Sequence, residues 1–236
     1  MPGSESVTVH RNEAASPRLA SSGGGRRLSR RWIAGGLAVV LILALVLVLA
    51  WYRIAGQRAE QVEVMWTGVP ECTGADVVSH TEKGPLGEES WSGPLIQAER
   101  EMRCVITVEV RNHSGGNVHL DHALLPFMGP DGGAVIKADT TADTDVWRTP
   151  PDIGIDSLRL LDVTLHHGET TTFDISLAFR ESGCSGGPGG GGRTWVEGFP
   201  TVTVTTLGRT IDRPALDDLS FTQMSPSRGC GRMARD

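Results

Sequence analysis

The residues with the clearest potential for chemistry lie in the stretch Gly183–Pro188, which reads Gly-Cys-Ser-Gly-Gly-Pro. Ser185 fits the GxSxG pattern, in which a serine is the nucleophile of acyl transfer. That mechanism needs a strand before the serine and a helix after it, because the hydroxyl must be held at a sharp turn. Pro188 and Gly189–Gly192 follow instead, and they do not begin a helix. We therefore predict a flexible loop and no catalytic residue.

The same stretch also resembles the GDSGGP segment of trypsin-like serine proteases, which implies a nucleophilic Ser185 on a double-barrel fold. Cys184 stands where that family has Asp, and no TAAHC-like His segment lies upstream. A catalytic serine needs a His as its base. The resemblance is therefore confined to the loop itself.

Five histidines form a second candidate group for chemistry. A strand over residues 118–127 places His119 and Asp121 on one face, where they could share a metal with a third ligand, while His122 points to the other face. The spacing shows no dense ligand set, and no Cys is followed closely by His and Met as in blue copper sites. We predict surface histidines and no metal or cofactor at these positions: His113, His119, His122, His166 and His167.

An acidic segment at residues 139–155 carries oxygen ligands, of which only Asp143 and Asp145 approach the alternate spacing of a calcium loop. A solvated loop is the default interpretation. Two tryptophans in or beside turn-rich segments, Trp147 and Trp195, are expected to be exposed. The possible binding surface predicted from the sequence consists of these four residues.

The four cysteines, Cys72, Cys104, Cys184 and Cys230, favour two disulfides if this part of the chain lies in an oxidising compartment. Four cysteines allow three pairings. We expect Cys72–Cys104, because the first follows one predicted strand and the second opens its antiparallel neighbour. We expect Cys184–Cys230 to tie down the C-terminal tail. The absence of a CxxC pair argues against zinc.

The elements that position these residues are short strands. The segments 103–111 and 170–180 alternate between apolar and polar residues, which indicates half-buried strands. Further strands are predicted at 61–67, 118–127, 134–138, 158–165, 201–207, 210–213 and 220–223, whereas Gly68–Glu99 reads as irregular and turn-rich. Seven to nine short strands without a helical period predict an all-β fold over residues 61–236, an immunoglobulin-like antiparallel β-sandwich.

Residues 32–52 contain no charge, and twelve of residues 33–49 are Leu, Ile or Val. Such a run predicts one N-terminal transmembrane α-helix, with Trp32, Trp51 and Tyr52 at the membrane interfaces. Residues 1–31 hold six Arg against two Glu, whereas the remainder holds 16 basic and 26 acidic residues. The positive-inside rule predicts a cytoplasmic N-terminus and an extracytoplasmic C-terminal domain. An acidic domain argues against nucleic acid as a partner.

The remaining segments are a disordered basic tail at 1–31 and a linker at 53–60. The apolar run is longer than that of a cleaved signal peptide, and bulky residues follow Ala50, so we favour a retained signal-anchor. Ser29–Ile33 partly resembles a twin-arginine export signal, which leaves the export route open. Arg outnumbers Lys twenty to two, which is typical of a high-GC bacterium.

Together these features predict a single-pass cell-membrane protein with a non-catalytic interaction or structural module in the bacterial cell envelope. Its expected partners are the membrane and an unknown protein or envelope component. One alternative is a hydrolase or metal-dependent enzyme that uses the loops 139–155 and 183–193. A second alternative is a carbohydrate-binding module.

Overall fold

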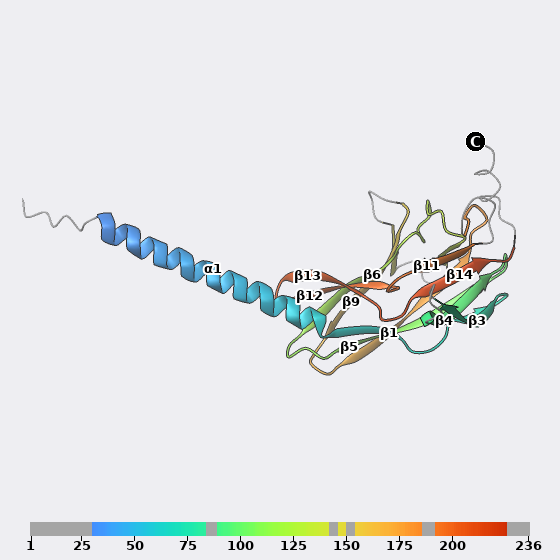
Figure 1. Ribbon diagram of the computed structural model, residues 1–236, viewed down its shortest axis with the longest axis horizontal. Helices are drawn as coiled ribbons and strands as arrows, with labels where there is room; N and C mark the ends of the chain where they lie inside the picture. Colours follow the sequence, from blue (N-terminus) through green and yellow to red (C-terminus); the bar gives the residue numbers. More distant parts are fainter. Residues whose placement is uncertain (1–29, 84–88, 142–145, 150–153, 186–191, 226–236) are drawn as a thin grey trace, which may run out of the picture. The chain divides into compact units, whose positions relative to one another are not determined.

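The computed structural model of the protein (Figure 1) describes residues 30–83, 89–141, 146–149, 154–185 and 192–225. These residues form one helix, α1 (Arg30–Glu60), followed by fourteen β-strands. The chain divides into two compact units, Met1–Leu47 and Val48–Asp236, so the last turns of α1 belong to the second unit. The predicted tail lies almost entirely outside the described residues.

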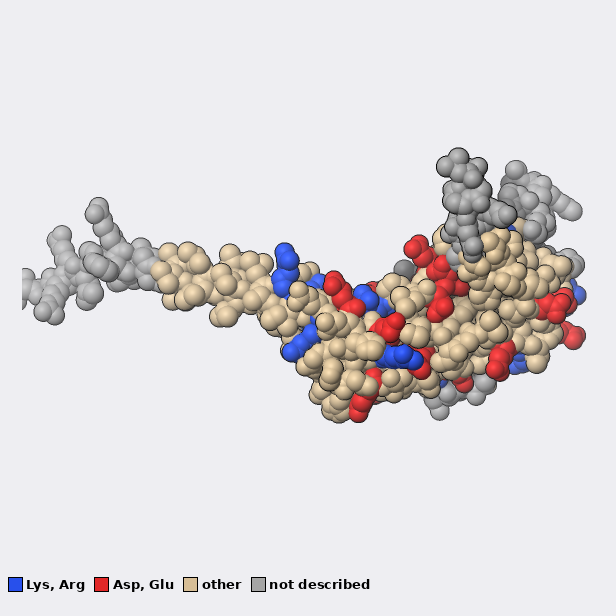
Figure 2. Space-filling view, turned by 60° about the horizontal axis from the view of Figure 1, so that its bottom comes forward, with Lys and Arg blue, Asp and Glu red and all other residues tan. Residues whose placement is uncertain are grey.

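Helix α1 is long and apolar enough to cross a membrane. Within Leu37–Glu60, the most apolar 18-residue window has a mean hydropathy of 2.6, and none of that window is buried inside the protein. In Figure 2 the tan part of the helix shows no charged side chains until basic ones appear near its C-terminal end. Residues 53–60, expected to be a linker, form the last turns of α1. Within those turns Ala55 and Ala59 are completely buried.

The first sheet has the strand order β1-β5-β10-β7, with β2 also paired to β5. Its central strands are the two segments predicted from clean alternation, and the apolar face of each is buried as expected. On β5, for example, Ile106 and Val108 are at most 1% exposed. The strands are β1 (Val62–Trp66), β2 (Glu71–Thr73), β5 (Arg103–Asn112), β7 (Ile136–Ala138) and β10 (Thr170–Phe179).

The second sheet has the order β11-β14-β4-β3. It holds the only parallel strand pair of the described part of the chain, β14 with β4. The segment Gly68–Glu99, expected to be irregular, contributes β2, β3 and β4, so that expectation was wrong. Strand β3 lies at the sheet edge, and its described side chains are at most half-buried, so no buried apolar face marks it. The strands are β3 (Asp76–Lys83), β4 (Glu89–Ala98), β11 (Arg193–Val196) and β14 (Leu219–Gln223).

The third sheet has the order β13-β12-β6-β9-β8, with all neighbours antiparallel. The pairing of β6 with β12 passes from Leu120–Val204 to His122–Thr203, so Asp121 is the extra residue of a β-bulge on β6. The strands are β6 (Val118–Leu125), β8 (Trp147–Arg148), β9 (Ser157–Leu165), β12 (Thr201–Thr206) and β13 (Arg209–Pro214).

A single hydrophobic core joins the three sheets. It includes Ile106 and Ile175 of the first sheet, Phe221 of the second and Leu120 of the third. Phe199, in the turn before β12, is fully buried in the same core. The fold class is confirmed in its general form: mostly β-strands in curled antiparallel sheets, preceded by one apolar helix.

Candidate functional site

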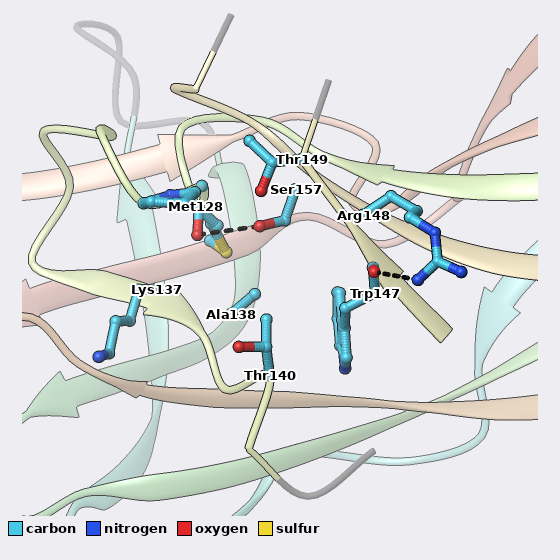
Figure 3. Close-up of a pocket in the computed structure, with 10 residues that line it drawn as sticks. Met128, Lys137, Ala138, Thr140, Trp147, Arg148, Thr149 and Ser157 are labelled. Carbon is cyan, nitrogen blue, oxygen red and sulfur yellow. Dashed lines mark hydrogen bonds between the residues drawn. The ribbon is translucent and has the colours of Figure 1, made fainter. Parts of the chain in front are cut away.

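A pocket of about 300 Å³ opens beside β7 and β8 (Figure 3). Its lining combines an indole ring, three hydroxyl side chains, two cationic side chains and the backbone of a tight turn. The described lining residues are Met128, Gly129, Pro130, Lys137, Ala138, Thr140, Trp147, Arg148, Thr149 and Ser157. A concave site with an aromatic wall and several hydroxyl groups is suited to a small polar ligand or a peptide side chain.

In Figure 3 the ring of Trp147 faces Ala138 and Thr140 across the pocket. The Ser157 hydroxyl donates to the Met128 carbonyl at 3.3 Å, which ties the start of β9 to the turn. Arg148 donates from Nη1 to the Trp147 carbonyl at 2.7 Å. The pairing of β8 with β9 places Trp147 beside the start of β9, which Ser157 joins to the turn.

The turn at residues 127–132 forms one wall of the pocket. It is held by Arg180, which immediately follows β10. Its guanidinium donates to the carbonyl of Pro130 at 2.8 Å and to that of Gly129. Arg180 is only 4% exposed, and burial lowers the pKa of its guanidinium while the nearby Asp131 carboxylate opposes that shift. A buried charge bound to backbone carbonyls fixes their orientation, since losing either partner would leave a polar group unsatisfied.

The turn also lies directly against the segment before β9. The Gly129 amide donates to the Ile155 carbonyl at 2.7 Å, and the Asp131 amide donates to the Gly154 carbonyl at 2.8 Å. A Cβ atom on Gly129 would lie 2.2 Å from the Asp156 carbonyl oxygen, and one on Gly132 would lie 2.0 Å from that of Phe127. Glycine is required at both positions because backbone carbonyl oxygens lie too close for a Cβ atom.

Asp139, the first residue of the predicted acidic loop, is buried beneath the pocket rim. Its carboxylate accepts hydrogen bonds from the Thr141 hydroxyl at 2.6 Å and from Arg103 Nη1 at 2.6 Å. Burial acts to raise the pKa of Asp139. The hydrogen bonds from Thr141 and the charges of Arg103 and Lys137 outweigh burial and hold this pKa below its ordinary value. Asp139 therefore stays ionised and fixes the loop instead of facing solvent.

The residues of the predicted binding surface differ in their exposure to solvent. Trp195 is 51% exposed on β11, as expected. Trp147 is only 8% exposed, so the prediction that it is exposed was wrong. Strand β8 pairs with β9 and brings the indole onto the core, which its sequence neighbours do not reveal. Asp143 and Asp145 lie outside the described residues.

Ser185 is fully buried, and both its hydroxyl and its backbone amide form hydrogen bonds. Its hydroxyl donates to the Gly192 carbonyl at 3.1 Å, and its amide donates to Gln223 Oε1 at 3.3 Å. The loop residues 186–191 lie outside the described residues. The first contact joins residues on the two sides of the glycine-rich loop, and the second joins Ser185 to β14. Ser185 therefore helps to hold the base of the loop.

The histidines of β6 differ from the sequence prediction. The bulge at Asp121 places both Asp121 and His122 on the outer face, so the prediction that His122 points the other way was wrong. His119 Nε2 lies 3.6 Å from Asp121 Oδ1 and 3.5 Å from Asp162 Oδ1. Among the residues that the structure describes, no group of three or more His, Cys, Asp or Glu side chains is arranged to hold a metal ion.

The other three predicted histidines lie at the turns that follow β5 and β9. His113 contacts Glu63 at 3.2 Å, His166 contacts Asn117 at 2.9 Å, and His167 contacts the Ser114 carbonyl at 2.6 Å. Their ring nitrogens contact neighbouring side chains and backbone, which is consistent with surface histidines.

One of the two expected disulfides is confirmed. Cys72 and Cys104 face each other on β2 and β5 and form a bond with an S–S distance of 2.01 Å. Cys184 is also disulfide-bonded. Because Cys230 lies outside the described residues, the Cys184–Cys230 pairing stays a prediction.

Sequence reasoning missed Arg180 and the turn at Gly129 as the elements that build the pocket. The Gly-Pro-Asp-Gly run marks a turn by composition. Its contact with Arg180 spans 51 residues of sequence, so no local pattern indicates it. Comparison with protein-family models and with curated proteins gave no match, so the geometry alone supports an assignment of function.

Proposed function

We propose that this protein is a single-pass membrane protein whose β unit is a non-catalytic binding module displayed outside the cytoplasm. The observation that carries the proposal is helix α1. Its most apolar 18-residue window is not covered by protein, whereas Ala55 and Ala59 in its last turns are buried. A lipid bilayer is the solvent in which such a helix is stable.

Two features support an extracytoplasmic β unit. Four arginines precede the apolar span closely, whereas Arg53 and Arg58 after it are offset by Glu60 and Glu63, so the positive-inside rule favours a cytoplasmic N-terminus. The disulfide between Cys72 and Cys104 is typical of an oxidising compartment.

We further propose that the β unit is an immunoglobulin-like sandwich. In support, β5 and β10 of the first sheet and β6 and β12 of the third contribute buried residues to one core. Connections such as β5 to β6 cross from the first sheet to the third, as in sandwich folds.

The pocket beside Trp147 supports a binding role for the module. The pocket and the end of α1 lie at opposite ends of β6. Strand β6 begins at Val118, after the turn that joins it to β5, and ends at Leu125, before the turn that lines the pocket. Eight strand residues span roughly 26 Å. We infer that an envelope protein or glycan binds at this pocket. The buried, hydrogen-bonded Ser185 favours this reading over a hydrolase.

The proposal is tested with the full-length protein immobilised in detergent and exposed to a solubilised envelope fraction. We expect a protein or glycan component to be retained by the wild type and lost with Thr140→Tyr, which fills the pocket. Thr172→Tyr is the matched control, because Thr172 is an exposed threonine on β10. Retention that is equal in all three proteins, or absent from the wild type, would contradict a pocket-based binding function.

The enzymatic rival is separated by assaying the same preparations on generic ester and peptide substrates with and without added metal ions. Activity that disappears in Ser185→Ala, while the protein stays folded, would favour a hydrolase over a binding module. Tryptophan fluorescence during glycan titration separates a carbohydrate ligand from a protein ligand.

A further inference from the structure

The end of α1 and the tip of the β12–β13 hairpin form a cluster of exposed aromatic, aliphatic and cationic side chains. We name Trp51, Tyr52, Leu207 and Arg209 the junction cluster. The Trp51 indole donates to the Leu207 carbonyl at 3.0 Å, and Arg209 Nη1 donates to the Tyr52 carbonyl at 2.9 Å. The Arg209 guanidinium carbon lies 3.6 Å from the centre of the Tyr52 ring. The hairpin tip is therefore fixed to the helix at these two residues.

The junction cluster exposes much apolar surface. Trp51 is 43% exposed, Tyr52 is 51% exposed and Leu207 is 45% exposed. Contiguous exposed apolar side chains mark contact surfaces for proteins or membranes. Trp and Tyr at the end of an apolar span, with a cation beside them, are the residue types that prefer the lipid headgroup region.

The hairpin turn is built from an unusual residue for its conformation. Leu207 has a φ of 51° and Gly208 a φ of 75°. Two-residue hairpin turns with positive φ at both positions favour Asn-Gly, because a leucine side chain is strained there. In water, an exposed leucine in a strained conformation adds nothing to the stability of the fold. In contact with lipid, the same side chain would be removed from water and would stabilise the bound state.

The depth of the hairpin tip follows from its hydrogen bond to Trp51. The apolar run of α1 ends at Trp51 and Tyr52, and the next residue is Arg53. Small residues on the following turn let the hairpin approach, since a Cβ atom on Gly56 would lie 3.2 Å from Arg209 Nη1. Whatever depth Trp51 has in the bilayer, the tip of the hairpin shares it.

We propose that the tip of the β12–β13 hairpin is a second membrane contact of this protein, seated in the headgroup region of the bilayer that α1 spans. Leu207 would enter the interface and Arg209 would lie beside lipid phosphates. This inference rests on the proposed membrane anchoring and adds a lipid-facing surface to the β unit. It predicts that the unit is held against the membrane at this end instead of moving freely around a linker.

The test uses the full-length protein in phospholipid vesicles with an environment-sensitive fluorescent amino acid at one position at a time. The positions are Leu43 in the apolar span, Leu207 at the hairpin tip and Val69, which is 70% exposed beyond the far end of β1. Quenchers are lipids that carry a nitroxide at a shallow or a deep acyl position. We expect deep quenching at Leu43, shallow quenching at Leu207 and none at Val69.

The outcomes separate the two proposals. Quenching at Leu43 with none at Leu207 would overturn the hairpin contact and leave the anchor standing, whereas no quenching at any position would overturn both. Because the probe at Leu207 is itself apolar, a second experiment places it at the exposed Thr210. Shallow quenching at Thr210 should be weakened in the Trp51→Phe, Arg209→Ala double variant, which removes both donors that hold the hairpin tip to α1. Quenching that persists unchanged in this background would show that these two contacts do not set the depth of the tip.

Discussion

Arg103 and Asp139 form an ion pair of unequal exposure, with 2.6 Å between Arg103 Nη1 and Asp139 Oδ2. The arginine side chain is 68% exposed and the aspartate side chain 8% exposed. The surface cation therefore covers a carboxylate that also accepts hydrogen bonds from Thr141. This arrangement places the acidic loop against β5, and the pocket rim is built on it.

The lowered pKa of Asp139 predicts a pH-dependent stability. Because the folded pKa is below the ordinary value of 3.8, the ionised carboxylate stabilises the fold above that value, and this contribution is lost as pH falls through the folded pKa. We expect Asp139→Asn to cost about 1–3 kcal/mol near neutral pH, because hydrogen bonds to a buried charge are lost.

The measurement is urea unfolding of both proteins at neutral pH and below the ordinary pKa. The difference in free energy of unfolding should shrink in acid. Arg103→Gln is the control and should cost no more than about 1 kcal/mol, since an exposed partner is screened by water. A difference that is constant with pH would refute the role given to Asp139.

Arg180 is expected to be a strong determinant of stability. Arg180→Met should lower the free energy of unfolding by about 3 kcal/mol, because the carbonyls of Gly129 and Pro130 lose their donors. Arg180→Lys should be nearly as harmful, since an ammonium does not reproduce the fork of the guanidinium.

The matched control is Arg100→Met, because Arg100 pairs with Glu181 at the surface with a side chain 57% exposed. It should cost less than about 1 kcal/mol. Equal effects of the Arg100 and Arg180 variants in chemical denaturation would count against a buried, turn-holding arginine.

Gly129→Ala should disrupt the turn at the pocket. The new methyl group would lie 2.2 Å from the Asp156 carbonyl oxygen, so the backbone must move, at a cost on the order of 2–3 kcal/mol. Gly115→Ala is the comparison, because a Cβ atom there meets nothing within 4 Å. Thermal unfolding of the two variants should show a clear loss for position 129 and almost none for position 115.

The disulfide of β2 should stabilise the fold by restricting the unfolded chain. Its two cysteines are 32 residues apart, so the chain-entropy model gives a loss of about 4 kcal/mol for the Cys72→Ala, Cys104→Ala double variant, as an upper figure. The melting temperatures of the double variant and the wild type, both without reductant, measure this. A double variant as stable as the wild type would show that this disulfide does not contribute to the stability of the fold.

Strand prediction succeeded where one face of a strand is buried. Alternation on β5 and β10 indicated the buried residues correctly, because side chains of a strand point alternately to the core and to solvent. It failed for β3, which is an edge strand without a fully buried described residue. It also failed at His122, because a bulge adds a residue and reverses the alternation after it.

The candidate site was predicted only in part. Trp147 was singled out for its residue type, but its burial against β9 and its place in the pocket depend on pairing across the sheet. Arg180 was not singled out, because a lone arginine after a strand resembles any surface residue. Its burial follows from the turn that closes over it.

The sequence by itself determined the apolar span of α1, the inward faces of the central strands and the pairing of Cys72 with Cys104 as an expected bond. The first two features are local, since side-chain periodicity and the length of an apolar run are set by neighbouring residues. The cysteine pairing followed from the expected pairing of neighbouring strands. The tertiary structure decided which loops meet at the pocket, where β6 bulges and that the β12–β13 hairpin contacts Trp51 and Tyr52. The contact of Arg180 with Gly129 spans 51 positions, and that of Arg209 with Tyr52 spans 157. Only closure of the whole chain around one core brings such residues together.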